Sequence, residues 1–99
     1  MDETVSEMQT ASVLLTHDVG LHARPSVKLT KLAKGFDASI EIAASEDGPW
    51  IDAKSIVKVM AMKAPRDTTL HIRAAGPAAV EAVDALVDLV NRDFDEAAS

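Results

Sequence analysis

The chain has no cysteine and no tyrosine, and its aromatic residues are two phenylalanines and one tryptophan. Without cysteine, neither disulfide bonds nor thiolate metal sites can hold the fold, which suits a reducing cytoplasm. So few aromatic rings leave little that could stack on nucleobases, and a net charge of −6 opposes binding to a phosphate backbone. A nucleic-acid-binding module is therefore excluded as an interpretation, and the expected partner is another protein.

Other signals are also missing from the sequence. No apolar run approaches the roughly 20 residues that span a bilayer, and the acidic segment 1–7 lacks the basic-then-apolar pattern of a secretion signal. We therefore expect a cytoplasmic protein with no membrane insertion. The three histidines lack metal-ligand spacing, so we expect no metal site and interpret His17 and His71 as bystanders. No P-loop motif is present, so a phosphate source must be another protein.

The most informative stretch is Gly20–Ser26, with the sequence GLHARPS. His22 directly precedes a predicted helix, because Pro25 is favoured in a first turn, where an N–H would lack an intrahelical acceptor. The free N–H groups of such a turn, with the positive end of the helix dipole, form an anion site. Arg24 adds a forked, permanently charged donor for phosphate oxygens. An imidazole is partly neutral and nucleophilic at neutral pH, so His22 is predicted to accept a phosphoryl group. The alternative is a helix cap or a plain surface histidine.

This stretch resembles the active-site signature of HPr, the histidine-containing phosphocarrier of the phosphoenolpyruvate-dependent phosphotransferase system. A second HPr-like signature, DAKSIVKVM at 52–60, follows at the expected distance, and the resemblance covers roughly residues 11–94. It implies that Nδ1 of His22 receives the phosphoryl group from phospho-enzyme I and passes it to a histidine of a IIA protein. The pathway would be sugar uptake or the nitrogen-related regulatory branch. Such a protein is a carrier with a phosphohistidine intermediate rather than a free-standing turnover enzyme, and it needs no cofactor.

The resemblance also assigns roles around these two signatures. Ala23, Arg24 and Pro25 would form the helix start that stabilises the phosphate, with Arg24 pairing with it during transfer. Ser55 is predicted to start a helix, where its hydroxyl would satisfy a free N–H. In some bacteria the matching serine is the target of a dedicated HPr kinase/phosphorylase, and a phosphate there adds about two negative charges. An alternative function is therefore a binding regulator controlled at Ser55, with His22 not used.

The helix after Ser55 carries a candidate docking surface. Ile56, Val57 and Met60 are predicted to remain partly exposed, with Val59 and Met62 on the buried side. A small apolar patch beside an active site indicates a partner surface, although all five residues could instead pack in the core. The resemblance implies that this patch docks enzyme I and the IIA proteins. We expect the protein to be a monomer.

Hydrophobic periodicity predicts the order β-α-β-β-α-β-α. The resemblance implies an α+β fold, an open-faced sandwich in which three helices cover one face of a four-stranded antiparallel sheet. We expect a disordered extension over 1–10, the domain over 11–94 and a flexible tail over 95–99. The expected strands are 12–16, 39–43, 50–52 and 69–74, and the first two expected helices are 23–34 and 54–63. A third helix is expected to begin after Gly76 and Pro77, and its buried side is expected to extend to Phe94.

Two positions depart from the family pattern. After the second helix many HPr sequences have two glycines that frame a turn, and Lys63 and Asp67 occupy those places here, with Pro65 between them. We therefore expect a different backbone in this turn. We also expect Gly35 to end the first helix in the left-handed conformation, and the lysines at 28, 31 and 34 to face solvent.

Overall fold

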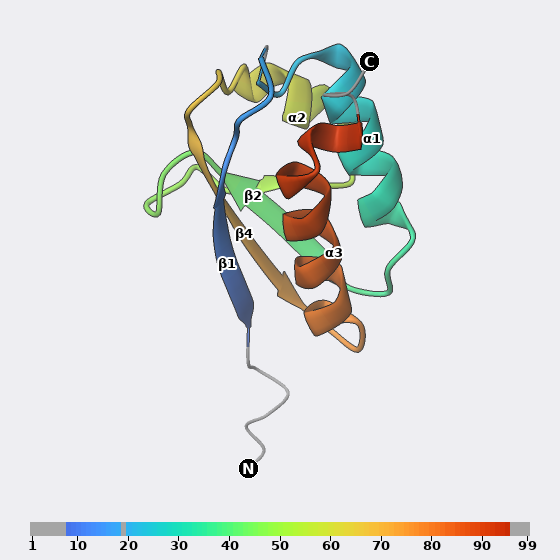
Figure 1. Cartoon of the computed structure of the whole chain (residues 1–99). Coiled ribbons are helices and arrows are strands. Elements are labelled where there is room, and N and C mark those ends of the chain that lie inside the picture. The colour runs from blue at the N-terminus through green and yellow to red at the C-terminus, as the bar shows by residue number, and fades with distance from the viewer. Residues whose placement is uncertain (1–7, 19, 96–99) are drawn as a thin grey trace.

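The computed structural model describes residues 8–18 and 20–95, and within them the predicted order of strands and helices is confirmed (Figure 1). A short 3₁₀ turn, η2, follows the last helix. The elements are β1 (Gln9–Leu14), α1 (Ala23–Lys34), β2 (Ser39–Ala43), β3 (Ile51–Asp52), α2 (Ile56–Met62), β4 (Thr69–Ala75), α3 (Ala79–Asn91) and η2 (Asp93–Asp95).

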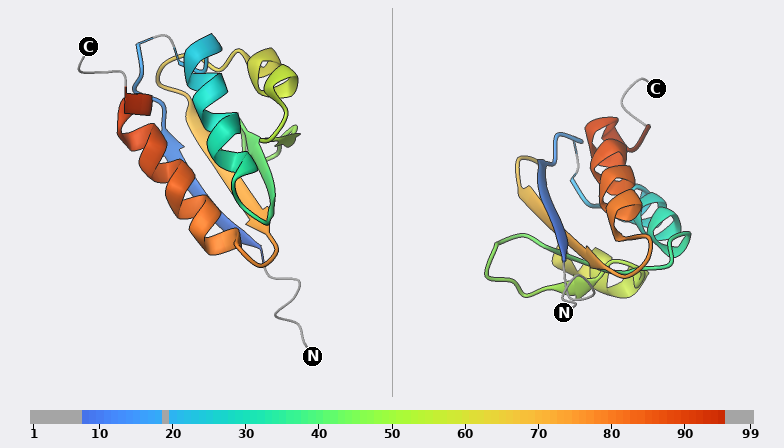
Figure 2. Two further views of the ribbon diagram at one scale, coloured as in Figure 1. Left: turned by 90° about the vertical axis from the view of Figure 1, so that its right-hand side faces the viewer. Right: turned by 90° about the horizontal axis from the view of Figure 1, so that it is seen from below.

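The strands form one antiparallel sheet in the order β1-β4-β2-β3. Figure 2 shows α1 and α3 lying across one face of this sheet, with α2 beside the start of α1. Among the described residues, no helix covers the other face, where Trp50 of the loop before β3 packs over Arg73. This is the predicted α+β open-faced sandwich. No helix within 8–18 and 20–95 combines the length and apolar character needed to cross a bilayer.

Side-chain alternation decides which face of the sheet is covered. In β4, Leu70, Ile72 and Ala74 are buried against the helices, whereas the residues between them are more accessible. The amphipathic helices α1 and α3 supply the opposite side of the core. The largest fully buried side chains are Phe94, Leu15, Leu21, Leu29, Ile40, Ile42, Leu70, Ile72, Leu86, Val59, Val90 and Pro25.

The first strand and the last helix differ from their predicted bounds. The first strand begins at Gln9, which pairs with Ala74, so residues 9 and 10 belong to the sheet and not to an extension. The prediction missed this start because Gln9, Thr10 and Ala11 show no alternation of large apolar side chains, whereas pairing with β4 depends on backbone groups. Phe94 is fully buried as expected, but it lies in η2, beyond the end of α3. The rest of the predicted extension and tail, 1–7 and 96–99, lies outside the described residues.

Two backbone expectations were wrong. Gly35 ends α1 in the right-handed conformation (φ −78°, ψ −5°), and its N–H donates to the Leu32 carbonyl at 3.0 Å. The turn after α2 uses the left-handed region for which glycine is the default residue, although it contains none: Lys63 has φ 52° and Asp67 has φ 75°. For a residue with a Cβ, this conformation costs about 1–2 kcal/mol.

We predict that the same substitution, valine to alanine, changes the free energy of unfolding differently at a buried and at an exposed position of α3. Val83→Ala removes two methyl groups from a side chain that is 5% exposed, and it should lower the free energy of unfolding by about 2 kcal/mol. Val80→Ala, at a side chain that is 52% exposed, should change it by less than about 0.5 kcal/mol. Urea denaturation measures both, and equal losses would contradict the packing described for α3.

Candidate functional site

His22 occupies the N-cap position of α1. Its backbone is extended (φ −86°, ψ −165°), and its carbonyl accepts the first helical hydrogen bond, from the Ser26 N–H at 2.9 Å. Its side chain is exposed and makes no capping hydrogen bond to the helix. The imidazole is therefore accessible to a partner, and it stands at the end of the helix where the first-turn N–H groups point outward.

Buried side chains in the first turn fix the start of α1. Pro25 and Ser26 are both buried, and the Ser26 hydroxyl donates to the Leu21 carbonyl at 3.2 Å. No acidic residue lies in this turn. The burial of Pro25 and Ser26 and this hydrogen bond thus fix the turn that carries His22. No carboxylate in the turn would repel an incoming anion.

The loop before His22 packs directly on the backbone that follows α2. The N–H of Leu21, a buried residue, donates to the Ala64 carbonyl at 2.9 Å. Gly20 has φ +66°, and a Cβ placed on it would lie 2.3 Å from the same carbonyl oxygen. Only glycine fits this contact, because any side chain would meet both steric overlap and an unfavourable dihedral angle.

The turn η2, near the C-terminus, also contacts the loop before His22. The Thr16 hydroxyl donates to the Asp93 carboxylate, and the His17 and Phe94 rings form a T-shaped contact at a centroid distance of 5.9 Å. Lys28, expected to face solvent, is half-buried and donates from Nζ to the Phe94 carbonyl at 2.8 Å. His17 is therefore part of the packing that holds the loop. Sequence reasoning missed this contact because the two segments lie at opposite ends of the chain.

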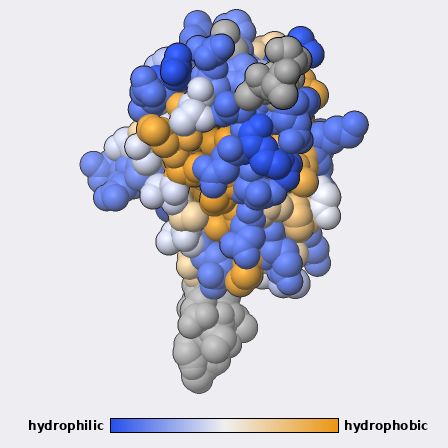
Figure 3. All heavy atoms as spheres, in the orientation of Figure 1, coloured by the Kyte–Doolittle hydropathy of each residue, from blue (hydrophilic) through white to orange (hydrophobic). Residues whose placement is uncertain are grey.

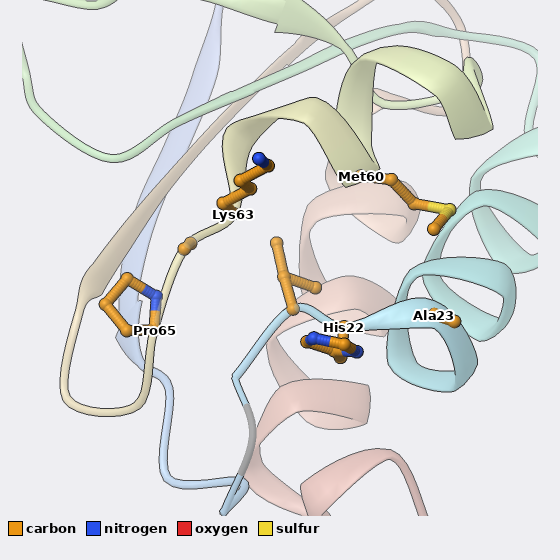
Figure 4. A pocket seen from close by; sticks show the side chains of 7 residues that line it. His22, Ala23, Met60, Lys63 and Pro65 are labelled. Carbon is orange, nitrogen blue, oxygen red and sulfur yellow. The ribbon is translucent and has the colours of Figure 1, made fainter.

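An open pocket of about 500 Å³ joins the two sequence signatures (Figure 4). His22 and Ala23 contribute from the start of α1, Met60 from α2, and Lys63 and Pro65 from the segment after α2. Figure 4 shows His22 across the pocket from the end of α2, where Lys63 lies. Leu21 and Ala64, which share the backbone hydrogen bond, complete the lining.

Arg24 follows on α1, where its side chain is exposed. It borders a smaller hollow of about 260 Å³, together with Ala23, Val27 and Lys28. Neither this hollow nor the His22 pocket has an acidic residue among its described lining residues. The surroundings of His22 are therefore locally basic, although the whole chain carries a charge of −6.

Ser55 is the N-cap of α2, as expected. Its hydroxyl accepts a hydrogen bond from the Lys58 N–H at 3.3 Å. Val57 and Met60 are 75% and 42% exposed, Ile56 is half-buried, and Val59 is fully buried. The interpretation in which all the apolar residues of this helix pack in the core is therefore excluded. Figure 3 shows hydrophobic surface emerging in small areas between hydrophilic side chains.

The chain is similar to known phosphocarriers along nearly its whole length. Residues 9–92 match the family model described as "PTS HPr component phosphorylation site". The phosphocarrier protein NPr of Escherichia coli K12 is 33% identical over 85 residues, which cover 86% of this chain and 93% of NPr. The phosphocarrier protein HPr of Cupriavidus necator is 40% identical over 82 residues, covering 83% and 90%. Among solved structures, HPr-C-His from Thermoanaerobacter tengcongensis superposes with a TM-score of 0.82 at 30% identity, covering 89% of this chain and 97% of that one.

Adding one methyl group should disrupt the loop at Gly20 and spare the helix end at Gly35. Gly20→Ala forces a Cβ against the Ala64 carbonyl at positive φ, so the free energy of unfolding should fall by at least about 2 kcal/mol. Gly35→Ala is the matched control, since Gly35 has negative φ and a Cβ there would lie 3.3 Å from the Leu32 carbonyl oxygen. It should change stability by less than about 1 kcal/mol in either direction.

Urea denaturation of the two variants gives this comparison, and hydrogen exchange at the Leu21 amide reports on the loop itself. In Gly20→Ala this amide should lose protection. If the two variants were equally stable, with Leu21 equally protected, the close contact between the loop and Ala64 would be refuted.

Proposed function

The chain belongs to the HPr family of phosphocarriers of the phosphotransferase system, and we propose that His22 carries its phosphoryl group. Phospho-enzyme I is the proposed donor, and a histidine of a IIA protein is the proposed acceptor. The observation that carries this proposal is the exposed imidazole of His22 at the N-terminus of α1. It makes no capping hydrogen bond to the helix, and it lines an open pocket. In this position a ring nitrogen is accessible to the phosphoryl donor, and the backbone N–H groups of the first turn of α1 lie close to it.

Transfer requires one bond to form and one to break. The lone pair of a neutral ring nitrogen, which the family resemblance identifies as Nδ1, attacks phosphorus while the bond from phosphorus to the donor opens on the opposite side. Charge builds on the three remaining oxygens, and we propose that the first-turn N–H groups of α1 and the Arg24 guanidinium stabilise it. The reverse process, with an acceptor histidine as nucleophile, discharges the carrier.

The partner surface is proposed to be the exposed apolar face of α2, formed by Ile56, Val57 and Met60. This face borders the His22 pocket through Met60, so a protein docked on it would reach the imidazole. Flexible methionine and exposed valine suit a surface that accommodates enzyme I and several IIA proteins in turn. The identity of the acceptor would distinguish sugar uptake from the nitrogen-related branch. We propose that the carrier acts as a monomer in the cytoplasm.

Ser55 is the proposed site of regulation in a cell that contains the kinase. Phosphorylation would replace the hydroxyl that caps α2 with about two negative charges, next to Ile56 and Val57. Docking of partners would weaken as a result. The alternative in which Ser55 alone carries the function, with His22 idle, predicts that a His22 variant loses nothing.

His22→Ala should abolish labelling by phosphoenolpyruvate and enzyme I, because no other side chain occupies the N-cap of α1. The matched control is His71→Ala, which removes a half-buried imidazole from β4, away from the pocket lining. That variant should accept label like the unaltered protein. Radiolabelled phosphoenolpyruvate and intact-protein mass measure the result. Full labelling of His22→Ala, or labelling that maps to Ser55, would overturn the proposal.

Val57→Glu should raise the KM of enzyme I for the carrier about tenfold and leave kcat nearly unchanged, because a charge would disrupt an apolar contact remote from the reacting atoms. Val80→Glu is the control, since Val80 is also exposed but lies on α3. Steady-state transfer kinetics separate the two effects. Equal KM values for both variants would show that α2 is not the docking helix.

A further inference from the structure

Lys63 is the one lysine or arginine among the described residues that line the His22 pocket. It lies across the pocket from the imidazole, at the C-cap of α2 (Figure 4). Its side chain is exposed, and in the structure it runs along the end of α2 rather than toward His22. The flexible four-carbon stem of a lysine permits its ammonium group to swing into such a pocket when an anion is present.

The backbone at Lys63 is in an unfavourable conformation. With φ 52° and ψ 38° it is left-handed, and its N–H closes α2 by donating to the Met60 carbonyl at 3.2 Å. Glycine would adopt these angles freely, whereas lysine is strained there. Strained residues of this kind are concentrated at functional sites. Here the strained residue is also the one that brings a positive charge to the pocket.

The ammonium group of Lys63 has no competing partner within 8–18 and 20–95. Other basic side chains do have one: Lys54 donates to the Phe36 carbonyl, and Arg73 pairs with Glu41. Lys63 makes no ion pair or side-chain hydrogen bond with any residue in these ranges. No interaction would therefore have to be broken before it could bind a new anion.

We propose that Lys63 is a second phosphate-binding cation, which contacts the phosphoryl group once His22 carries it. The inference rests on the proposed function and extends it to a residue outside both signatures. A phosphoryl group brings about two negative charges to the pocket, and the Lys63 ammonium would pair with its oxygens from the α2 side. Lys63 would thus stabilise the charged carrier relative to the uncharged one and shift the phosphoryl equilibrium toward this protein.

An exchange experiment measures this shift directly. The unaltered protein and Lys63→Asn are mixed in equal amounts with limiting phosphoenolpyruvate and a trace of enzyme I. The reaction runs to equilibrium, and intact-protein mass gives the phosphorylated fraction of each. Because enzyme I acts only as catalyst in this exchange, the final partition does not depend on how well either protein docks. Asparagine tolerates the left-handed conformation, so the substitution removes the charge and spares the turn.

At low salt the unaltered protein should hold about two- to fivefold more phosphoryl group than Lys63→Asn, the range expected of an exposed ion pair. The ratio should approach one in high salt, which screens the pair. Lys63→Arg should partition like the unaltered protein. Lys58→Asn removes the same charge from the exposed surface of α2, outside this pocket, and should leave the ratio near one.

The outcomes separate the two proposals. A ratio of one for Lys63→Asn at low salt, or a ratio matched by Lys58→Asn, would overturn the role of Lys63 and leave His22 as the carrier. If the unaltered protein gained no phosphoryl group, the proposed function itself would fail.

Discussion

The geometry of the site depends on one close approach, between the loop that precedes α1 and the backbone that follows α2. The Leu21 N–H donates to the Ala64 carbonyl, and Gly20 lies too near that carbonyl for any side chain. Because of this contact, the start of one helix and the end of another share a pocket. His22, Met60 and Lys63 meet there although they come from different elements. The sheet and the buried faces of α1 and α3 hold these segments in place.

The charges near His22 differ in sign from the charge of the whole chain, and this difference suits a protein that carries an anionic group. The chain as a whole is acidic, yet the described residues around His22 are basic or neutral, and the first turn of α1 contains no carboxylate. A helix N-terminus attracts a phosphoryl group but holds it only moderately, because the group remains exposed to solvent. Moderate stabilisation is what a carrier requires, since the group must leave again. The proposed contact from Lys63 would adjust that balance without creating a deep binding site.

Features with a local cause could be predicted from the sequence. The amphipathic period and Pro25 identify α1 to the residue, and alternation identifies β2. The start of β1 could not be predicted, because Gln9, Thr10 and Ala11 show no alternation of large apolar side chains. The contacts of Thr16 and His17 with the C-terminal turn were missed because they join distant segments. In the sequence, Lys63 is only a departure from the glycine of the family pattern. Its left-handed backbone and its position in the same pocket as His22 are features of the three-dimensional structure that the sequence does not indicate.

The central claim is that the first turn of α1 holds the phosphoryl group on His22. Amide chemical shifts, recorded by NMR before and after phosphorylation, test it most directly. The account predicts that the largest changes occur at the N–H groups of Ala23 and Arg24, whereas the Lys58 N–H, already bonded to Ser55, changes little. The account would be contradicted if the changes were largest at the start of α2, or if the phosphorylated protein showed none at Ala23 and Arg24.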